Sequence, residues 1–299
     1  MPDSYQRVFH GDGWVAKPEA TVPVASLAMR YGLSVFEGVR LYRQAGRTQV
    51  QPFLLGAHVD RLRASLAMMR IEDPGVDRLP ELVDELVARN GIDDDAYVRI
   101  AVSAGNPGTI AEPVQPLLTV SATPMGRKRW LRTDEGMRLR ISDWQRAPEA
   151  SFPAAAKNIS NYAGPRLAVL EAKDAGFDGC VLTNQHGRLC EAPTAALFLL
   201  TDGVLRTPAL TEGVLPGITR RWVLDTAAEV GLAVEETTLE RVDAYRADEA
   251  FLCGTGIEFA FVRGFDEHAC KGWPRASATR ALVQRYFSDA RTAAMVGAA

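Results

Sequence analysis

The stretch AAAKNISNYAG at residues 154–164 places Lys157 directly after three alanines, with Tyr162 five residues further on. The chain has only five lysines against twenty-nine arginines, so arginine is its usual fixed positive charge. A lysine among small apolar residues suggests that its amine is used, because partial burial lowers the pKa of an ammonium and favours the neutral nucleophile. The stretch therefore predicts a Schiff-base lysine, with a surface lysine that packs its stem on a helix as the alternative.

Three further motifs in the second half of the chain could belong to the same site. LPGITR at 215–220 places Pro and Gly before a helix, whose free backbone N–H groups favour phosphate; an ordinary helix cap is the alternative. CGTGIEF at 253–259 offers open N–H groups and the hydroxyl of Thr255 to an anion, unless it is a plain turn. Glu191 in LCEAPT is either a site carboxylate or a solvated strand end.

These features together match the needs of one cofactor. Pyridoxal phosphate has an aldehyde, a phosphate and a ring nitrogen that works best when protonated. A covalent amine, two anion-binding motifs and a carboxylate would serve those three groups. The combination therefore predicts a pyridoxal-phosphate site, which none of the motifs would predict alone.

The composition predicts a globular, cytoplasmic chain with two domains. Single cores stop growing near ~250–300 residues, and this chain has 299. A net charge of −3, with arginines and acids interspersed, argues against a nucleic-acid partner. No apolar run approaches the ~18 residues of a membrane span. The first residues, MPDSYQRVFHGDGW, lack the order of a signal peptide, a basic segment followed by an apolar one.

The cysteines argue against a metal site. Cys180, Cys190, Cys253 and Cys270 show no CxxC spacing, so zinc is not expected. In a cytosolic chain we expect free thiols, although Cys180 and Cys190 could face each other across a hairpin.

Periodicity and turn residues predict mixed strands and helices on both sides of a linker. In the first half we expect strands in 8–15, 34–42, 50–55, 96–105 and 116–124, and helices over 54–71 and 78–92. In the second half we expect strands in 138–144, 179–192 and 195–208, and helices over 164–176, from near Pro216-Gly217 to Gly231, and over 277–290. Over 244–265 we expect a short helix followed by two strands joined by a Gly-rich turn. The basic segment TPMGRKRWLRTDEGM lacks periodicity. The predicted organisation is a small N-terminal α/β domain at 1–124, a linker at 125–135 and a large C-terminal cofactor-binding domain at 136–299.

The chain resembles the class IV aminotransferases, the fold-type IV group of pyridoxal-phosphate enzymes, and most closely the branched-chain amino-acid aminotransferases. The resemblance covers nearly the whole length. It implies an α+β, two-domain fold like that of D-amino-acid aminotransferase, with mixed sheets, packed helices and a larger C-terminal pseudo-barrel. It also implies at least a homodimer. The motifs that carry it, in the family's order, are YGLSVFEGVRLY (31–42), HVDRL (58–62), YVR (97–99), AKNISNY (156–162), LPGITR and CGTGIEF.

The resemblance implies a role for each residue that matches a cofactor motif. Lys157 would bind the cofactor aldehyde covalently and act as the catalytic base. Tyr162 would lie near the ring hydroxyl, and Glu191 would face the ring nitrogen and hold its proton. The residues that would bind the phosphate are Arg61, Ile218, Thr219 and Thr255.

The resemblance also implies a substrate side. Tyr97 and the backbone at Gly256 and Ile257 would hold the substrate carboxylate. Arg99 would bind the distal carboxylate of glutamate, because guanidinium pairs with carboxylate through two hydrogen bonds. Core aromatics and surface ion pairs are the alternatives for several of these residues. The remaining residues on the substrate side are Tyr31, Phe36, Gly38 and Arg40.

Two stretches depart from the family pattern. In EAPTAALF (191–198), Ala192 replaces a glycine and Ala196 replaces an asparagine, which removes a polar group near the ring but keeps the acid. In the linker, Met125 stands where branched-chain enzymes often have an aromatic residue. The first departure leaves the electronic tuning of the ring open. The linker often closes over substrate, so the second departure leaves the choice of substrate open.

The expected function is transamination between an L-amino acid, branched-chain or otherwise apolar, and a 2-oxo acid such as 2-oxoglutarate. A D-amino-acid or (R)-amine aminotransferase and an aminodeoxychorismate lyase are alternatives on the same fold. A pyridoxal-phosphate-binding protein without turnover is a remote one. The expected partners are small molecules and further copies of the chain, with no nucleic acid, membrane or metal.

Overall fold

The computed structural model describes residues 5–133 and 135–292, which divide into two units. The first unit contains 5–126, 156–160 and 288–292, and the second contains the described residues of 127–155 and 161–287. Lys157 thus belongs to the first unit, although the sequence places it in the C-terminal domain. The boundaries at 1–124, 125–135 and 136–299 stay a prediction, and their positions 1–4, 134 and 293–299 lie outside the described residues.

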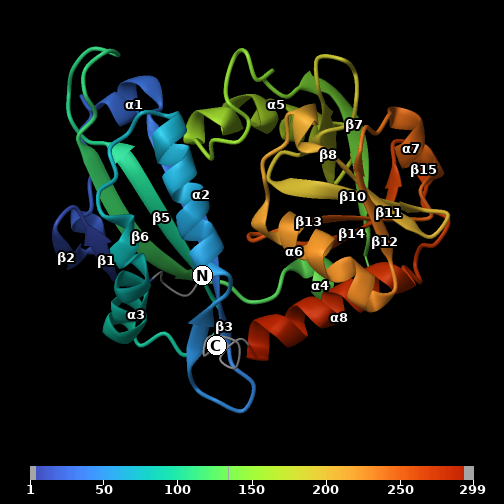
Figure 1. Ribbon diagram of the computed structural model, residues 1–299, viewed down its shortest axis with the longest axis horizontal. Coiled ribbons are helices and arrows are strands. Elements are labelled where there is room, and N and C mark those ends of the chain that lie inside the picture. The colour runs from blue at the N-terminus through green and yellow to red at the C-terminus, as the bar shows by residue number, and fades with distance from the viewer. Residues whose placement is uncertain (1–4, 134, 293–299) are drawn as a thin grey trace. The chain divides into compact units, whose positions relative to one another are not determined.

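A six-stranded antiparallel sheet in the order β2-β1-β6-β5-β3-β4 forms the centre of the first unit (Figure 1). Helices α2 (Leu55–Met68) and α3 (Leu79–Asn90) share one apolar core with the sheet, as their periodicity predicts. Gly91 ends α3 with φ at 58°, a conformation that favours glycine. The remaining elements are β1 (Arg7–His10), β2 (Gly13–Ala16), α1 (Leu27–Tyr31), β3 (Ser34–Arg43), β4 (Val50–Pro52), β5 (Ala96–Ala104) and β6 (Pro116–Pro124).

Strand β3 differs from its sequence prediction. The residues of SVFEGVRLY alternate between apolar and polar, a pattern that by itself favours a half-buried strand. In the structure every residue from Ser34 to Tyr42 is buried, including Glu37 and Arg40. The strand lies between β4 and β5 and is buried on both faces, so its polar residues are internal groups that require partners.

The second unit contains a mixed sheet with the path β12-β11-β10-β13-β14-β7-β8. The pairs β11–β12, β14–β7 and β7–β8 are parallel, whereas β10–β13 and β13–β14 are antiparallel. The α+β class with packed helices is therefore confirmed. The strands are β7 (Met137–Gln145), β8 (Gly179–Thr183), β9 (Glu191–Ala192), β10 (Ala195–Thr201), β11 (Val204–Pro208), β12 (Ala233–Thr237), β13 (Glu249–Gly254), β14 (Glu258–Phe265) and β15 (His268–Ala269).

Four α-helices of the second unit follow the predicted pattern closely. They are α5 (Ala163–Asp174), α6 (Ile218–Thr226), α7 (Arg241–Arg246) and α8 (Ser277–Thr292), the last of which ends in the first unit. The linker, predicted to lack regular structure, contains the short helix α4 (Arg129–Arg132). Strand β12 was not predicted, because its sequence AVEET is mostly exposed and carries no apolar period.

All four cysteines are buried free thiols, as the sequence predicts. Burial raises the pKa of Cys180 to about 11 and that of Cys190 to about 12. The alternative disulfide is not formed, because Thr183 pairs with Leu189 and so places Cys180 and Cys190 at different levels of the hairpin. Since the thiolate is the reactive form, these cysteines are chemically inert at neutral pH.

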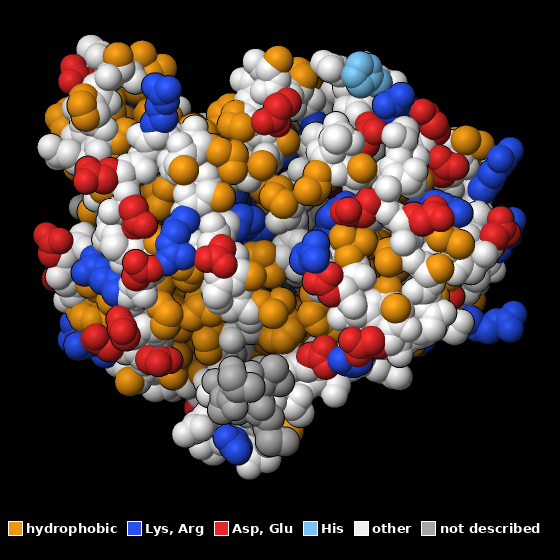
Figure 2. All heavy atoms as spheres, viewed as in Figure 1, with side chains coloured by type: hydrophobic (Ala, Val, Ile, Leu, Met, Phe, Trp, Pro, Cys, Tyr) orange, Lys and Arg blue, Asp and Glu red, His pale blue; other side chains and the backbone are white. Residues whose placement is uncertain are grey.

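The surface mixes charges of both signs. On the face that Figure 2 shows, lysine and arginine side chains are interspersed with aspartate and glutamate side chains. Within residues 5–133 and 135–292, no helix combines the length and apolarity needed to cross a membrane. The same residues contain no group of three or more His, Cys, Asp or Glu side chains that could hold a metal ion.

Candidate active site

The backbone of Lys157 is fixed on both sides by the first unit. Its N–H donates to the Oγ of Ser65 at 3.0 Å, and its carbonyl accepts the N–H of Phe36 at 3.0 Å. Ser65 lies on α2 and is completely buried. Val35 and Asn158 also form an antiparallel bridge. The segment therefore pairs with the edge of β3, and the side chain of Lys157 starts from a defined position.

The amine of Lys157 lies beside an aromatic ring. Its Nζ is 4.8 Å from the ring centroid of Phe36, and the guanidinium carbon of Arg99 is 4.0 Å from the same centroid. Cations at these distances are attracted by the ring quadrupole. The structure thus brings together three predicted site residues: the lysine, an apolar wall and a cation that can bind a carboxylate.

The register of β3 and β5 places the predicted substrate residues on one face of the sheet. Gly38 lies opposite Arg99, and Arg40 lies opposite Tyr97. Since side chains alternate along a strand, Phe36 shares this face. Tyr97 is partly buried and Arg99 is exposed, whereas the opposite face of β3 and β5 contributes to the apolar core.

Arg40 and Tyr31 each contact other residues of the first unit. Arg40 is completely buried, donates from Nη2 to the carbonyl of Gly126 at 3.3 Å, and lies 5.3 Å from the ring of Tyr42. Tyr31 ends α1, and the guanidinium of Arg30 lies 5.2 Å from its ring. The substrate roles of Arg40 and Tyr31 stay predictions.

Replacing Gly38 with alanine is expected to displace Tyr97. A Cβ at Gly38 would lie 1.8 Å from the hydroxyl oxygen of Tyr97 and 2.4 Å from its Cζ, so the phenol must move. We expect a loss of about 1–3 kcal/mol in the free energy of unfolding. If Tyr97 holds the substrate carboxylate, KM also rises. Urea unfolding and steady-state kinetics measure the two effects, and an unchanged KM with altered stability would contradict the role of Tyr97.

Arg61, the predicted phosphate ligand, belongs to a buried cluster in the first unit. Its Nε donates to Oε1 of Glu37 at 2.7 Å, and its Nη2 donates to Oε2 at 2.8 Å. The Nδ1 of His58 lies 2.7 Å from the same Oε2. Glu37 and His58 are fully buried, and the side chain of Arg61 is 11% exposed. Glu37 therefore fixes the orientation of the guanidinium of Arg61 through both carboxylate oxygens.

The pKa values in this cluster move in directions that match its hydrogen bonds. Burial raises the pKa of Glu37, but the charge and hydrogen bonds of Arg61, together with His58, outweigh it and bring that pKa to about 2. Burial lowers the pKa of His58, and the charges of Arg61 and Lys157 lower it further. These effects outweigh the hydrogen bond and charge of Glu37, which raise it. His58 is then neutral near pH 7. Because the ionised Glu37 can only accept, the proton of the imidazole sits on Nδ1.

Glu191 is a buried carboxylate in the second unit. Its Oε1 lies 3.0 Å from Nη2 of Arg146, and its Oε2 accepts the backbone N–H of Leu215 at 3.3 Å. The Nε of Arg146 also donates to the carbonyl of Gly213 at 3.3 Å. A buried carboxylate with a cationic partner stays charged more readily than an isolated one. The ion pair and Leu215 thus connect the acid to the start of LPGITR.

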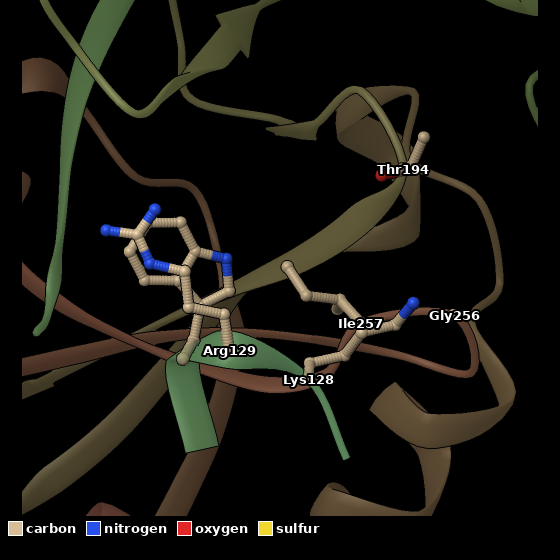
Figure 3. Close-up of a pocket in the computed structure, with 6 residues that line it drawn as sticks. Lys128, Arg129, Thr194, Gly256 and Ile257 are labelled. Atoms are coloured by element: carbon tan, nitrogen blue, oxygen red, sulfur yellow. The ribbon is translucent and has the colours of Figure 1, made fainter. Parts of the chain in front are cut away.

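The two anion-binding motifs also have the expected local structure. Gly217 is the N-cap of α6, and no side chain caps this helix, so its first N–H groups point outward. Ile218 and Thr219 form its first turn and are buried. Thr255 occupies the turn between β13 and β14, and Gly256 and Ile257 line a cavity of about 350 Å³ (Figure 3). These positions suit a phosphate and a carboxylate.

Tyr162, the remaining predicted cofactor residue, and the two replaced positions near Glu191 lie in the second unit. Tyr162 ends a short 3₁₀ turn and precedes α5. Ala196 pairs with Glu191 across β9 and β10, so the replaced asparagine position lies next to the acid. Ala192 and Ala196 are both buried, so small apolar side chains lie next to the acid.

Sequence reasoning missed three residues that hold predicted site residues. Glu37 and His58 support Arg61, and Arg146 supports Glu191. The spacing of His58 and Arg61 on one helix was a usable signal, because residues three apart share a helix face. Nothing local in the sequence indicates the partner of Glu191.

Comparisons with known proteins show which family the chain belongs to. The family model for amino-transferase class IV matches residues 34–265. The chain is 35% identical to the branched-chain-amino-acid aminotransferase of Salmonella typhimurium over 284 residues, which cover 93% of this chain and 91% of that protein.

The chain is a class IV aminotransferase.

Solved structures agree with this assignment. The branched-chain amino acid aminotransferase of Thermobaculum terrenum in its PLP form has a TM-score of 0.90 and 29% identity, covering 96% of this chain and 94% of that one. The branched-chain amino acid aminotransferase of Escherichia coli has a TM-score of 0.88 and 30% identity, with coverage of 97% and 95%. The predicted family, fold type and pyridoxal-phosphate cofactor are confirmed.

The residues of this class IV aminotransferase fit pyridoxal phosphate. The first unit supplies a fixed lysine amine and an oriented arginine, Lys157 and Arg61. The second unit supplies a buried carboxylate and an uncapped helix N-terminus, at Glu191 and Gly217. Each unit taken by itself thus carries groups of the kind that an aldehyde, a phosphate or a ring nitrogen requires. The enzyme is therefore a pyridoxal-phosphate-dependent transaminase acting on small amino and 2-oxo acids.

Proposed function

We propose that this transaminase moves the amino group of a branched-chain L-amino acid to 2-oxoglutarate. The observation that carries the proposal is the fixed Lys157, whose amine lies 4.8 Å from the ring of Phe36 with Arg99 beside the same ring. An apolar ring suits an aliphatic side chain, and a guanidinium suits the second carboxylate of 2-oxoglutarate. The relatives named as branched-chain-amino-acid aminotransferases support this substrate class.

We assign each cofactor contact to a residue of this chain. Lys157 holds the aldehyde, Tyr162 the ring hydroxyl, and Glu191 the proton on the ring nitrogen. Bound pyridoxal phosphate supplies an electron-accepting ring that stabilises the negative charge developing at the substrate α-carbon. The residues assigned to the phosphate are Arg61, Ile218, Thr219 and Thr255.

The chain itself supplies proton transfer and substrate orientation. Nζ of Lys157 would remove the proton from the substrate α-carbon as a positioned general base and would hold it for return as a general acid. Tyr97 and the N–H groups at Gly256 and Ile257 hold the α-carboxylate, so that the α-hydrogen faces the lysine. Arg99 binds the distal carboxylate when the acceptor occupies the same place. Tyr31, Phe36, Gly38 and Arg40 complete the substrate side.

A donor panel tests the proposal on the cofactor-loaded enzyme. We expect L-leucine, L-isoleucine and L-valine to give glutamate from 2-oxoglutarate with a kcat/KM at least about tenfold above that of D-leucine or an (R)-amine. A preference for D-leucine or the amine would establish the alternative aminotransferase. Release of pyruvate from aminodeoxychorismate without an acceptor would establish the lyase. Absence of turnover with every donor would indicate a non-catalytic binding protein.

We also propose that the enzyme works in the cytoplasm as a homodimer or larger homo-oligomer. Four free, buried thiols suit a reducing compartment. The side chains of Val24, Met29 and Ile110 are 86%, 64% and 69% exposed. The segments near Met29 and Ile110 are hydrogen-bonded to each other, since the N–H of Leu27 donates to the carbonyl of Asn106 at 2.9 Å. These exposed apolar side chains suit a subunit interface. A monomeric mass in sedimentation velocity would contradict this assembly.

A further inference from the structure

The cavity in the second unit is formed by segments that lie far apart in the sequence. Lys128, Arg129 and Trp130 come from the linker, Gly256 and Ile257 come from the turn between β13 and β14, and Thr194 precedes β10. Figure 3 shows the side chain of Lys128 extending toward Gly256, whereas Arg129 extends in a different direction. A lysine and two residues of a Gly-rich turn thus line one cavity.

The position of Lys128 is set by the turn that it faces. Its backbone N–H donates to Oε2 of Glu258 at 3.4 Å, and Glu258 directly follows Ile257. Glu258 is completely buried and has φ at 59°, a conformation that non-glycine residues adopt only when their surroundings hold it. Trp130 packs against the same apolar core cluster as Ile257. The hydrogen bond from Lys128 to Glu258 and the packing of Trp130 therefore hold the linker next to the turn.

Two of the linker arginines, Arg129 and Arg127, have partners in the second unit. Nε and Nη2 of Arg129 donate to Oε2 of Glu135 at 3.0 and 2.5 Å. The guanidinium carbon of Arg127 lies 4.2 Å from the ring centroid of Phe287, and Arg127 does not line the cavity. Lys128 and Arg129 are the linker cations that line the cavity, and of these two it is Lys128 whose side chain extends toward the turn in Figure 3.

We propose that Lys128 binds the α-carboxylate of the substrate together with the N–H groups at Gly256 and Ile257. This inference rests on the proposed function, which assigns the α-carboxylate to that turn. An ammonium adds a charge-assisted hydrogen bond where backbone N–H groups alone would bind weakly. Every amino acid and 2-oxo acid carries this carboxylate, so Lys128 contributes to both half-reactions. It selects carboxylate substrates against amines without a carboxylate.

Binding of unreactive acids to the cofactor-loaded enzyme tests the proposal without turnover. The probes are 4-methylpentanoate, its amide, and glutarate, and titration calorimetry measures the Kd of each. We expect Lys128→Met to raise the Kd of both acids by about tenfold to a hundredfold and to change the Kd of the amide by less than about threefold. We expect Lys128→Arg to restore most of the affinity for the acids. The matched variant Arg127→Met removes the neighbouring charge and should change each Kd by less than about threefold.

Three results would overturn the assignment of Lys128. They are an unchanged Kd for both acids, a loss confined to glutarate, and an equal loss in Arg127→Met, which would show a general effect of charge. Because the probes cannot react, failure of amino transfer in the donor panel would be a separate result. A wild-type enzyme that binds acid and amide equally would also reject the carboxylate site.

Discussion

Lys157→Ala is expected to lower kcat for amino transfer from L-leucine to 2-oxoglutarate by about 10⁴-fold. The variant removes the only side-chain amine that the structure fixes beside Phe36 among the described residues, through bonds to Ser65 and Phe36. Those bonds involve backbone atoms of residue 157, so alanine preserves them and the fold should persist. Steady-state kinetics at saturating donor and acceptor measure the loss.

A second readout separates loss of the amine from loss of structure. Borohydride reduction of the wild-type holoenzyme should leave a pyridoxyl label on the peptide that contains Lys157, and peptide mass spectrometry should find none in the variant. Lys173→Ala is the matched control, since Lys173 is exposed on α5. It should keep its label and its kcat. A labelled lysine elsewhere, or a variant within about tenfold of wild type, would refute the role of Lys157.

Glu37→Gln is expected to lower the free energy of unfolding by about 3–5 kcal/mol at pH 7. Glu37 is completely buried and accepts two hydrogen bonds from Arg61 and one from His58. Glutamine has a similar shape but no charge, so the largely buried guanidinium of Arg61 loses the negative charge of Glu37. Urea unfolding followed by tryptophan fluorescence measures the change.

Glu85→Gln is the matched control for that substitution. Glu85 pairs with Arg89 at 3.0 Å in the same unit, but both side chains are 48% exposed. Solvent screens such pairs, so we expect a loss below about 1 kcal/mol. Similar losses in the two variants would show that the buried cluster has no special role in stability.

The same cluster gives the stability of the wild type a defined pH dependence. The pKa of Glu37 falls from 4.5 to about 2 on folding, so its contribution is complete above pH 4.5 and is lost between pH 4.5 and 2. That shift corresponds to about 3 kcal/mol. His58, whose pKa is lowered from 6.5, begins to oppose folding as pH falls below 6.5. Unfolding measured from pH 7 to pH 3 should show the Glu37 loss in wild type and not in Glu37→Gln.

Helix periodicity and turn residues were enough to predict most of the elements. The spacing of Val59, Leu62 and Leu66 locates α2, because these residues face one core. The burial of β3 could not be predicted in the same way. Whether Glu37 and Arg40 are solvated depends on the strands and helices around them. The alternation of apolar and polar residues along one strand does not indicate those neighbours.

The candidate site shows the same division between motifs and their supports. Lys157 and Glu191 stand in recognisable stretches, so the sequence indicates both. Arg146 and Ser65 act through single hydrogen bonds or ion pairs to distant residues, and such residues have no local signature. Lys128 was visible in the sequence as part of a basic linker, but only the fold places it beside Gly256 and Ile257.

The division of the chain into interleaved segments has a consequence for synthesis on the ribosome. The first unit gains the strand-edge pairing of Val35 with Asn158 and, much later, the ion pair of Asp95 with Arg291. At about 5–20 residues per second, roughly 10–30 s separate translation of residue 126 from translation of residue 291. The edge of β3 that Asn158 covers stays open for a shorter time, roughly 2–6 s at the same rate, and then resembles the unpaired strands that promote aggregation. A nascent N-terminal half of this enzyme is therefore a natural client for a chaperone that shields strand edges.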